Sequence, residues 1–199
     1  MSSSSPSTLT AAAPAAPRAA DPEAGLAAAA RAAAFDHDKI AKLQKRLTNP
    51  WLMRAFLLGR LPLGFMASLR VKSIDTERCQ TTVPYGWRTQ NPFRSTYFAA
   101  QAMAAELSTG ALAMLAVESA PHSVAMLITG LESTFGKKAT DLTTFTCEDG
   151  AAIFDAVVET LATGEPATAR ASTVGRMPDG VEVSRFTFEW SFKKRGHRA

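Results

Sequence analysis

Apolar positions along the chain follow two different periods, and each period predicts a different kind of element. Over residues 36–47 apolar side chains return every three or four positions, which predicts a helix that Asp36 caps. The Asn49-Pro50 step ends this helix, and a second, apolar helical segment is predicted over residues 51–58. The folded part of the chain is therefore expected to begin with two short helices.

Segments of alternating apolar and polar residues, bounded by Gly, Pro and Asp, predict strands along the rest of the chain. The predicted strands cover residues 68–74, 78–85, 124–135, 141–148, 167–176 and 181–192, and a short helix is predicted over 151–161. In the last strand the aromatic residues from Phe186 to Phe192 share one face, and Val183 is out of phase with them. A bulge is therefore predicted near Ser184. Since short connections join most neighbouring strands, we expect an antiparallel sheet.

Residues 95–118 predict one long helix that the rest of the fold encloses. Apolar or small residues occur all around its helical wheel, as they do in a helix buried on most sides. Polar residues such as Gln101 and Ser108 interrupt the apolar run, so we expect no transmembrane span. A long helix combined with an antiparallel sheet indicates an α+β fold.

The first 34 residues differ from the rest in composition. They hold 15 alanines, 5 serines and 4 prolines, and no aromatic residue. Such a segment buries too little apolar surface to offset the entropy lost on ordering, so residues 1–34 are expected to form a disordered leader. An organelle transit peptide is the alternative, and Asp21 and Glu23 count against it. The segment lacks the leucine-rich block of a secretory signal.

The formal charge of +4 is unevenly distributed. Residues 1–34 are neutral, residues 35–60 carry six Lys or Arg and two Asp, residues 61–192 carry ten basic and fourteen acidic residues, and the tail 193–199 adds four basic residues. We take these as the parts of the protein: leader, N-terminal helical lid, main domain and basic tail. Because the main domain is mildly acidic, nucleic acid is not an expected partner.

The segment 35–60 supports two interpretations. A lid packed across the edge of the sheet is favoured, because exposed strand edges need to be covered. A basic first helix followed by an apolar second one is also typical of a segment that lies on a membrane surface, which makes a membrane the less favoured partner.

The cysteines and histidines indicate neither a disulfide framework nor a metal centre. Cys79 and Cys147 are the two cysteines, without a metal-like spacing, and they fit the reducing conditions of the cytoplasm. The three histidines fall at a predicted helix start, a loop and the tail, where surface positions are expected. We therefore expect no metal and no resident cofactor.

Glu106 is the single charged residue among the 23 residues from 95 to 117, which make up nearly all of the predicted long helix. No cation lies one helical turn away, so no ion pair within the helix offsets the cost of burying its carboxylate. Two structural interpretations are open. Either Glu106 lies on a solvated stripe of the helix, or an arginine from elsewhere in the fold pairs with it. The favoured one is a carboxylate in an apolar cleft that acts as a base or nucleophile near neutral pH.

The segment from Asn91 to Gly110 resembles the thioesterases of the hotdog superfamily. In their phenylacetate-degradation-like branch the pattern is roughly N-x-x-G-x-x-H-G-G, followed by an apolar stretch and L-A-E or L-A-D. Asn91 occupies the asparagine position, and Ala104-Ala105-Glu106 takes the place of the acidic triplet. The resemblance covers about residues 50–192 and is strongest to the thioesterase-like branch of domains of unknown function. It implies a hotdog fold, in which a curved antiparallel sheet wraps a long helix.

The sequence departs from the pattern at its histidine and glycines. Tyr97 stands where histidine falls, Phe98 and Ala99 stand where the glycines fall, and Arg94 replaces another frequent glycine. In the family, backbone N–H groups near those glycines polarise the thioester carbonyl, so larger side chains are expected to narrow this site.

The resemblance implies an acyl-CoA or acyl-carrier thioesterase that needs no metal. Glu106 is then the general base or nucleophile, Asn91 positions water or the carbonyl, and Tyr97, Phe98 and Ala99 supply the oxyanion site. Coenzyme A enters as part of the substrate, with phosphate contacts expected from the cations Arg94, Lys137 and Lys138.

Family members pair their sheets side by side, so a homodimer or a dimer of dimers is expected. Two other functions stay open. The first is a non-catalytic acyl or lipid binder, and the second is a membrane-peripheral protein that uses the hotdog as a dimerisation scaffold.

Overall fold

The computed structural model describes residues 33–196. Almost all of the predicted leader and the last three residues of the tail thus lie outside the described residues. By length and composition one described helix, Phe98–Ser119, would suit a membrane crossing. However, 67% of its most apolar window is buried inside the fold, as expected of a core helix.

Within the described residues, six strands form one sheet in the order β1-β2-β4-β5-β6-β3, and every neighbouring pair is antiparallel. The strands are β1 Arg70–Ile74, β2 Cys79–Val83, β3 Val124–Phe135, β4 Thr143–Cys147, β5 Ala167–Arg176 and β6 Glu182–Lys194. The antiparallel sheet predicted from the alternating pattern is confirmed, with β1 and β3 as its edges.

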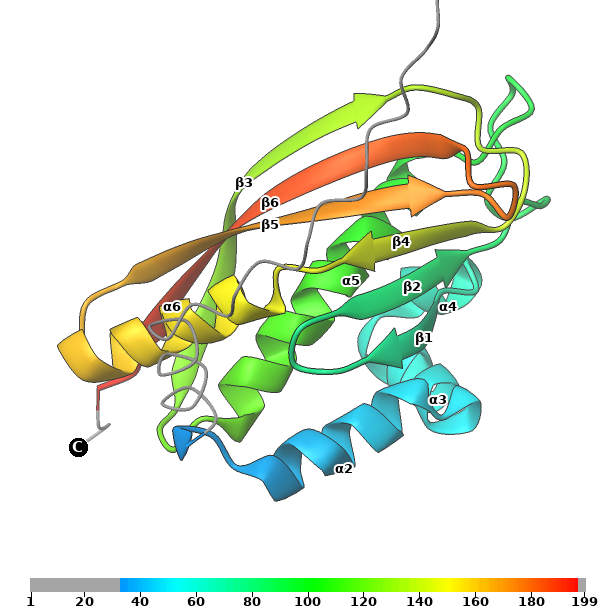
Figure 1. The fold of residues 1–199 in the computed structure, drawn as a ribbon. Coiled ribbons are helices and arrows are strands. Elements are labelled where there is room, and N and C mark those ends of the chain that lie inside the picture. Colours follow the sequence, from blue (N-terminus) through cyan, green and yellow to red (C-terminus); the bar gives the residue numbers. More distant parts are fainter. Residues whose placement is uncertain (1–32, 197–199) are drawn as a thin grey trace, which may run out of the picture.

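Helix α5, Phe98–Ser119, lies across the concave side of the curved sheet (Figure 1). Thirteen of its 22 residues are buried, and the aromatic side chains of β6 are buried on the same side. Helix α6, Gly150–Thr163, packs against α5 and the strands β5 and β6. This arrangement confirms the α+β class and the hotdog architecture.

The start of α5 differs from the predicted start at Ser95. The N–H of Thr96 donates to the carbonyl of Ala139, and the N–H of Tyr97 donates to the carbonyl of Thr89. Because these long-range bonds hold residues 96 and 97 in an extended path, the helix begins three residues later, at Phe98.

Three helices precede the sheet: α2 His37–Thr48, α3 Pro50–Arg60 and α4 Pro62–Met66. The side chain of Asp36 accepts from the N–H of Lys39, so the predicted cap is confirmed. Helix α2 packs against α5 and β1, and α3 also contacts β1, beside the edge of the sheet. The short helix α4 was not predicted, since the apolar pattern is interrupted before Pro62.

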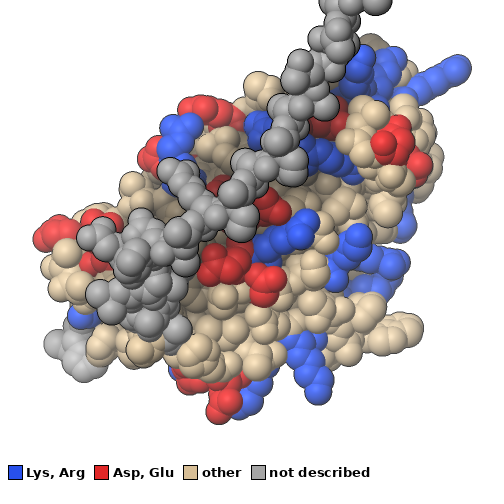
Figure 2. Space-filling view, viewed as in Figure 1, with Lys and Arg blue, Asp and Glu red and all other residues tan. Residues whose placement is uncertain are grey.

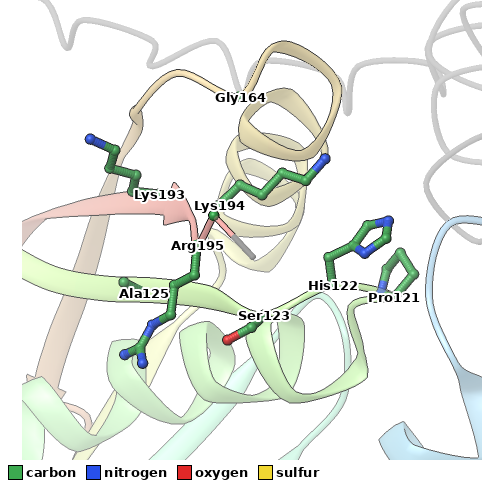
Figure 3. A pocket seen from close by; sticks show the side chains of 9 residues that line it. Pro121, His122, Ser123, Ala125, Gly164, Lys193, Lys194 and Arg195 are labelled. Atoms are coloured by element: carbon green, nitrogen blue, oxygen red, sulfur yellow. The ribbon is translucent and has the colours of Figure 1, made fainter. Parts of the chain in front are cut away.

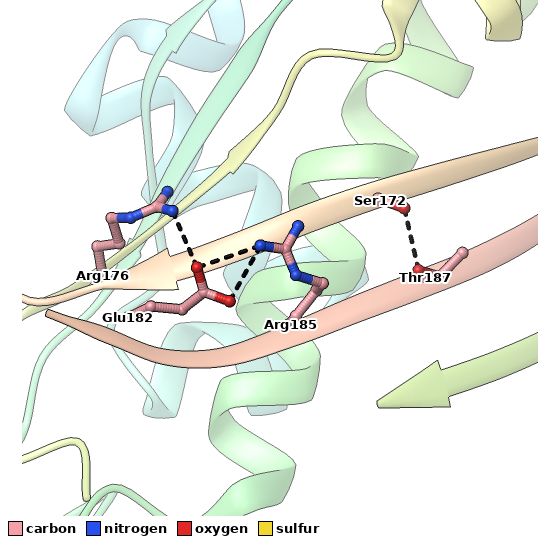
Figure 4. A network of polar contacts seen from close by, with 5 residues as sticks. All are labelled: Ser172, Arg176, Glu182, Arg185 and Thr187. Atoms are coloured by element: carbon pink, nitrogen blue, oxygen red, sulfur yellow. Dashed lines mark hydrogen bonds and ion pairs between the residues drawn. The ribbon is translucent and has the colours of Figure 1, made fainter. Parts of the chain in front are cut away.

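The β5–β6 hairpin carries the bulge that the aromatic phase of the last strand predicted. Gly175 pairs with Ser184 and Arg176 with Glu182, which leaves Val183 as the extra residue. On this hairpin the carboxylate of Glu182 accepts from Arg176 at 2.9 Å and from Arg185 at 3.0 Å, as Figure 4 shows. The bulge lets Val183 and Ser184 both be buried while the aromatic face continues towards α5.

The two cysteines face each other across β2 and β4. Cys79 and Cys147 are partners in the strand register, and both are buried and free. Burial raises the pKa of the Cys147 thiol to about 12 and also raises that of Cys79. These thiols therefore contribute packing rather than reactivity.

Candidate functional site

One side of α5 is covered less completely than the others, and Glu106 lies on it. The half-buried residues of the helix recur every three or four positions: Ala99, Ala102, Met103, Glu106, Gly110, Met114 and Val117. Glu106 is the charged member of this stripe, and its neighbours are apolar. Glu106 is thus a half-buried carboxylate among apolar residues, on a surface that a ligand or second chain can reach.

The Glu106 carboxylate and the Trp190 ring both lie close to Gly110. A Cβ at position 110 would be 3.2 Å from Oε1 of Glu106 and 3.4 Å from the Trp190 ring. The Trp190 indole N–H donates at 3.1 Å to Oγ1 of Thr109, so the ring is held against this part of α5. Among the described residues no Lys or Arg pairs with Glu106. Desolvation by burial raises the pKa of Glu106 above its ordinary value.

Polar contacts with the sheet fix the rotation of α5. The hydroxyl of Thr81 on β2 donates to the carbonyl of Ala104 at 2.6 Å. The hydroxyl of Ser108 donates to Thr173 on β5 at 2.8 Å, and Ser184 on β6 donates to the side chain of Gln101 at 2.8 Å. Because these bonds hold one side of the helix to the sheet, Glu106 is kept on the other side.

Asn91 belongs to a loop that leads into the N-terminal end of α5. Its Oδ1 accepts from the N–H groups of Phe93 and Ser95, and its Nδ2 donates to Oγ of Ser95 at 3.0 Å. The amide is therefore engaged in shaping its own loop. Arg94 in this loop has a φ of 58° and an exposed side chain, and it does not line the adjacent cleft.

A cleft of about 320 Å³ lies at this end of α5. Its lining includes Asn91, Phe98, Phe135, Lys137 and Lys138. Lys138 Nζ donates to the carbonyl of Phe93 at 3.1 Å, whereas the ammonium of Lys137 has no hydrogen bond or ion pair among the described residues. The fold thus brings together four residues that the sequence singled out: Asn91, Phe98, Lys137 and Lys138.

The proposed oxyanion residues mark the first turn of α5. The side chains of Tyr97 and Phe98 are exposed, and their rings meet edge to face at 5.0 Å. The N–H of Tyr97 is already donated to Thr89. The N–H groups of Phe98 and Ala99 have no acceptor among the described residues, as is usual at a helix N-terminus. Two of the three predicted positions thus have a backbone donor available.

Glu106 does not share the cleft with these donors. Eight residues separate it from Phe98, which at 1.5 Å per residue is about 12 Å along the helix axis. Its Oε1 is turned towards Gly110, away from the N-terminal end. Within one chain, therefore, a single carbonyl group cannot contact both the Phe98 N–H and the Glu106 carboxylate.

Helical spacing alone places Thr109 and Gly110 one turn away from Glu106. A glycine four residues after a glutamate leaves the carboxylate uncovered on that side. Trp190 was missed by the sequence reasoning, since only the strand register places it beside α5.

A depression of about 1200 Å³ lies at the opposite end of α5. It is lined by His122, Lys193, Lys194 and Arg195, among others. Figure 3 shows these side chains pointing in different directions, so they do not converge on one ligand. No residue singled out from the sequence as catalytic lines this depression.

Comparison with known proteins gives a family and a fold. The family model described as Domain of unknown function (DUF4442) matches residues 50–191. None of the curated proteins matches the chain.

Solved structures share the fold at low sequence identity. A protein of unknown function from Chlorobaculum tepidum TLS is 14% identical with a TM-score of 0.62, covering 75% of this chain and 99% of that one. A probable thioesterase from Pseudomonas aeruginosa is 16% identical with a TM-score of 0.61, covering 75% and 99%. A thioesterase from Haemophilus influenzae is 9% identical with a TM-score of 0.55, covering 79% and 99%.

Proposed function

The chain belongs to the DUF4442 family, and from this membership and the setting of Glu106 we propose that it is a thioesterase acting on acyl-CoA or acyl-carrier thioesters. One observation carries the proposal: a carboxylate that pairs with no cation among the described residues lies half-buried in an apolar stripe. The fold that presents it is shared with proteins described as thioesterases. The expected resemblance to the branch of unknown function is confirmed at the level of the family.

In the proposed reaction Glu106 acts on a water molecule. The carboxylate takes a proton as the water oxygen bonds to the thioester carbon, and the carbonyl oxygen becomes an oxyanion. N–H groups of Phe98 and Ala99 stabilise this oxyanion. The C–S bond then breaks, and the leaving thiolate takes up the proton held by Glu106. Direct attack by the Glu106 carboxylate, followed by hydrolysis of the anhydride, is the alternative route.

The proposed reaction needs two copies of the chain. Since one chain cannot offer the Phe98 N–H and the Glu106 carboxylate to the same carbonyl, we infer that a partner copy supplies one of them. Edge strand β3 supports such pairing, because Leu127, Leu131 and Phe135 on it are exposed apolar side chains. Two chains that join their β3 edges would form the side-by-side dimer expected from the resemblance.

The surroundings of the site support the proposed substrate class. The apolar side chains of Met103 and Phe98 suit an acyl chain, and Lys137 is the cation at the cleft that is free to meet a phosphate of coenzyme A. Lys138 is engaged with its own loop, so a smaller contribution is expected from it.

The test is hydrolysis of acyl-CoA thioesters of several chain lengths by the purified protein and by Glu106→Gln. We expect the substitution to lower kcat by about 10²- to 10⁴-fold, because it removes the base while keeping the shape. Glu118→Gln is the matched control, since Glu118 is an exposed glutamate on the same helix. Undiminished hydrolysis in Glu106→Gln would contradict the assignment. No hydrolysis by the native chain, together with co-purified fatty acid, would favour the non-catalytic binder.

A further inference from the structure

Helices α3 and α4 pack against each other and together expose several large apolar side chains. Their exposed fractions are 81% for Trp51, 60% for Leu58 and 65% for Leu63. Leu52 and Met66 are also exposed, at 50% and 59%. We call these five residues the α3–α4 surface.

Helix α3 is apolar on both its inner and its outer side. Met53 and Leu57 are buried beneath it, which accounts for its attachment to the fold. Trp51, Ala55 and Leu58 are exposed and follow the spacing i, i+4, i+7, so they form one outward stripe. A helix on a water-facing surface normally carries polar residues there, and an apolar outward stripe indicates contact with a second apolar phase.

The segment of the chain that carries the α3–α4 surface is strongly basic. From Lys39 to Ile74 the sequence contains eight Lys or Arg and no Asp or Glu. The guanidinium of Arg46 lies 5.4 Å from the ring centre of Phe56, and that of Arg54 lies 4.7 Å from that of Phe65. In this part of the described chain, the one ion pair is that of Lys39 with Asp36. Figure 2 shows blue side chains above and below an uncharged projection where α3 and α4 lie in Figure 1.

We propose that the α3–α4 surface docks on an anionic lipid bilayer. The apolar side chains enter the boundary between headgroups and acyl chains, where tryptophan is favoured, and the cations of this segment meet the anionic headgroups. The α3–α4 surface and the bilayer match in hydrophobicity and in charge, since the bilayer has apolar material directly beneath a layer of negative charge.

The charges also argue against two other partners for the α3–α4 surface. A second copy of this chain, docked through the same surface, would bring two strongly basic segments together, and like charges repel. The leader, residues 1–34, has no net charge to offer the cations. The proposal stands apart from the thioesterase proposal, because no residue of the α3–α4 surface takes part in the proposed chemistry.

The test is co-sedimentation of the full chain with vesicles of phosphatidylcholine containing about 30% phosphatidylglycerol, compared with pure phosphatidylcholine. We expect binding to the anionic vesicles, weaker binding to neutral ones, and loss of binding in about 0.5 M salt. The double substitution Trp51→Glu with Leu58→Glu is expected to weaken binding by at least about tenfold. Because both side chains are exposed, the thermal stability of this variant should match that of the native chain.

Trp87→Glu provides the matched control, since Trp87 is 84% exposed but lies outside the α3–α4 surface. It is expected to bind vesicles like the native chain. In a Trp87→Phe background, vesicles should also shift Trp51 fluorescence to shorter wavelength, because Trp190 is already buried. Three results would overturn the proposal: no vesicle binding, equal loss in Trp87→Glu, or a drop in oligomeric mass caused by the Trp51 and Leu58 substitutions.

Discussion

Glu106 is the residue on which the proposed chemistry depends most. Its Oε1 lies close to Gly110, which the Trp190 ring also approaches, and no cation pairs with it within the described chain. Burial without a partner raises the pKa of Glu106, which makes the carboxylate a stronger base and also makes its ionised form costly to the folded state.

This cost predicts a pH-dependent difference in stability between the native chain and Glu106→Gln. Below the ordinary pKa of 4.5 the carboxyl is protonated in both the folded and the unfolded state, so the substitution should change stability little. As the pH rises through the raised folded pKa, the native chain must ionise a buried group, and the glutamine variant does not. We therefore expect Glu106→Gln to unfold at a higher temperature at about pH 8 and at a similar temperature at about pH 4. Lower stability of the variant at pH 8 would show that a stabilising partner of the carboxylate exists.

Gly110→Ala is predicted to lower activity without lowering stability. The new Cβ would lie 3.2 Å from Oε1 of Glu106, so the carboxylate must shift by a few tenths of an ångström. Loss of this alignment is expected to lower kcat by about tenfold. Alanine is a better helix former than glycine by up to about 1 kcal/mol, so stability should be unchanged or higher. Gly59→Ala, where the Cβ meets open space, is the control that should leave kcat unaltered. Equal activities of the two variants would contradict the positioning role of Gly110.

At the scale of elements, local patterns predicted most of the fold and long-range contacts decided the rest. The bounds of β5 and the bulge beside Ser184 follow from alternation along the chain, which depends on which face is buried. The late start of α5 depends on hydrogen bonds to Thr89 and Ala139, which no local pattern reveals. The same holds for the site: Glu106 is visible in the sequence as an isolated charge, whereas the Trp190 ring near Gly110 is placed by strand register.

The first turn of α5 offers a test of the proposed oxyanion site. Phe98 is the first residue of the helix, where proline is tolerated, and Tyr97 before it has the extended ψ of 137° that proline requires. Phe98→Pro thus removes one N–H donor, and Phe98→Ala removes the same ring but keeps the N–H. We expect kcat of Phe98→Pro to be about 10²- to 10³-fold below that of Phe98→Ala, with similar thermal stabilities. Equal values of kcat would place the oxyanion donors elsewhere.

At the scale of the whole molecule, the separation of Phe98 and Glu106 along α5 means that the proposed reaction requires two chains. The proposed dimer has two sites, each using the Phe98 N–H of one chain and the Glu106 carboxylate of the other. Mass measurement in solution should give twice the 21.2 kDa of the chain, or four times that mass for a dimer of dimers. Charged substitutions at Leu127 and Leu131 on the β3 edge are expected to give monomers that do not hydrolyse thioesters.

Mixing two inactive variants tests the shared site directly. In a mixed dimer of Glu106→Gln and Phe98→Pro chains, one site combines both defects and the other has an intact N–H donor and an intact carboxylate. If equal amounts unfold and refold together at random, half of the dimers are mixed, so about a quarter of the sites should be active. Hydrolysis should therefore recover to about a quarter of the native rate, whereas each variant refolded alone should stay inactive. A site contained within one chain predicts no recovery, since every chain in the mixture carries one of the two defects.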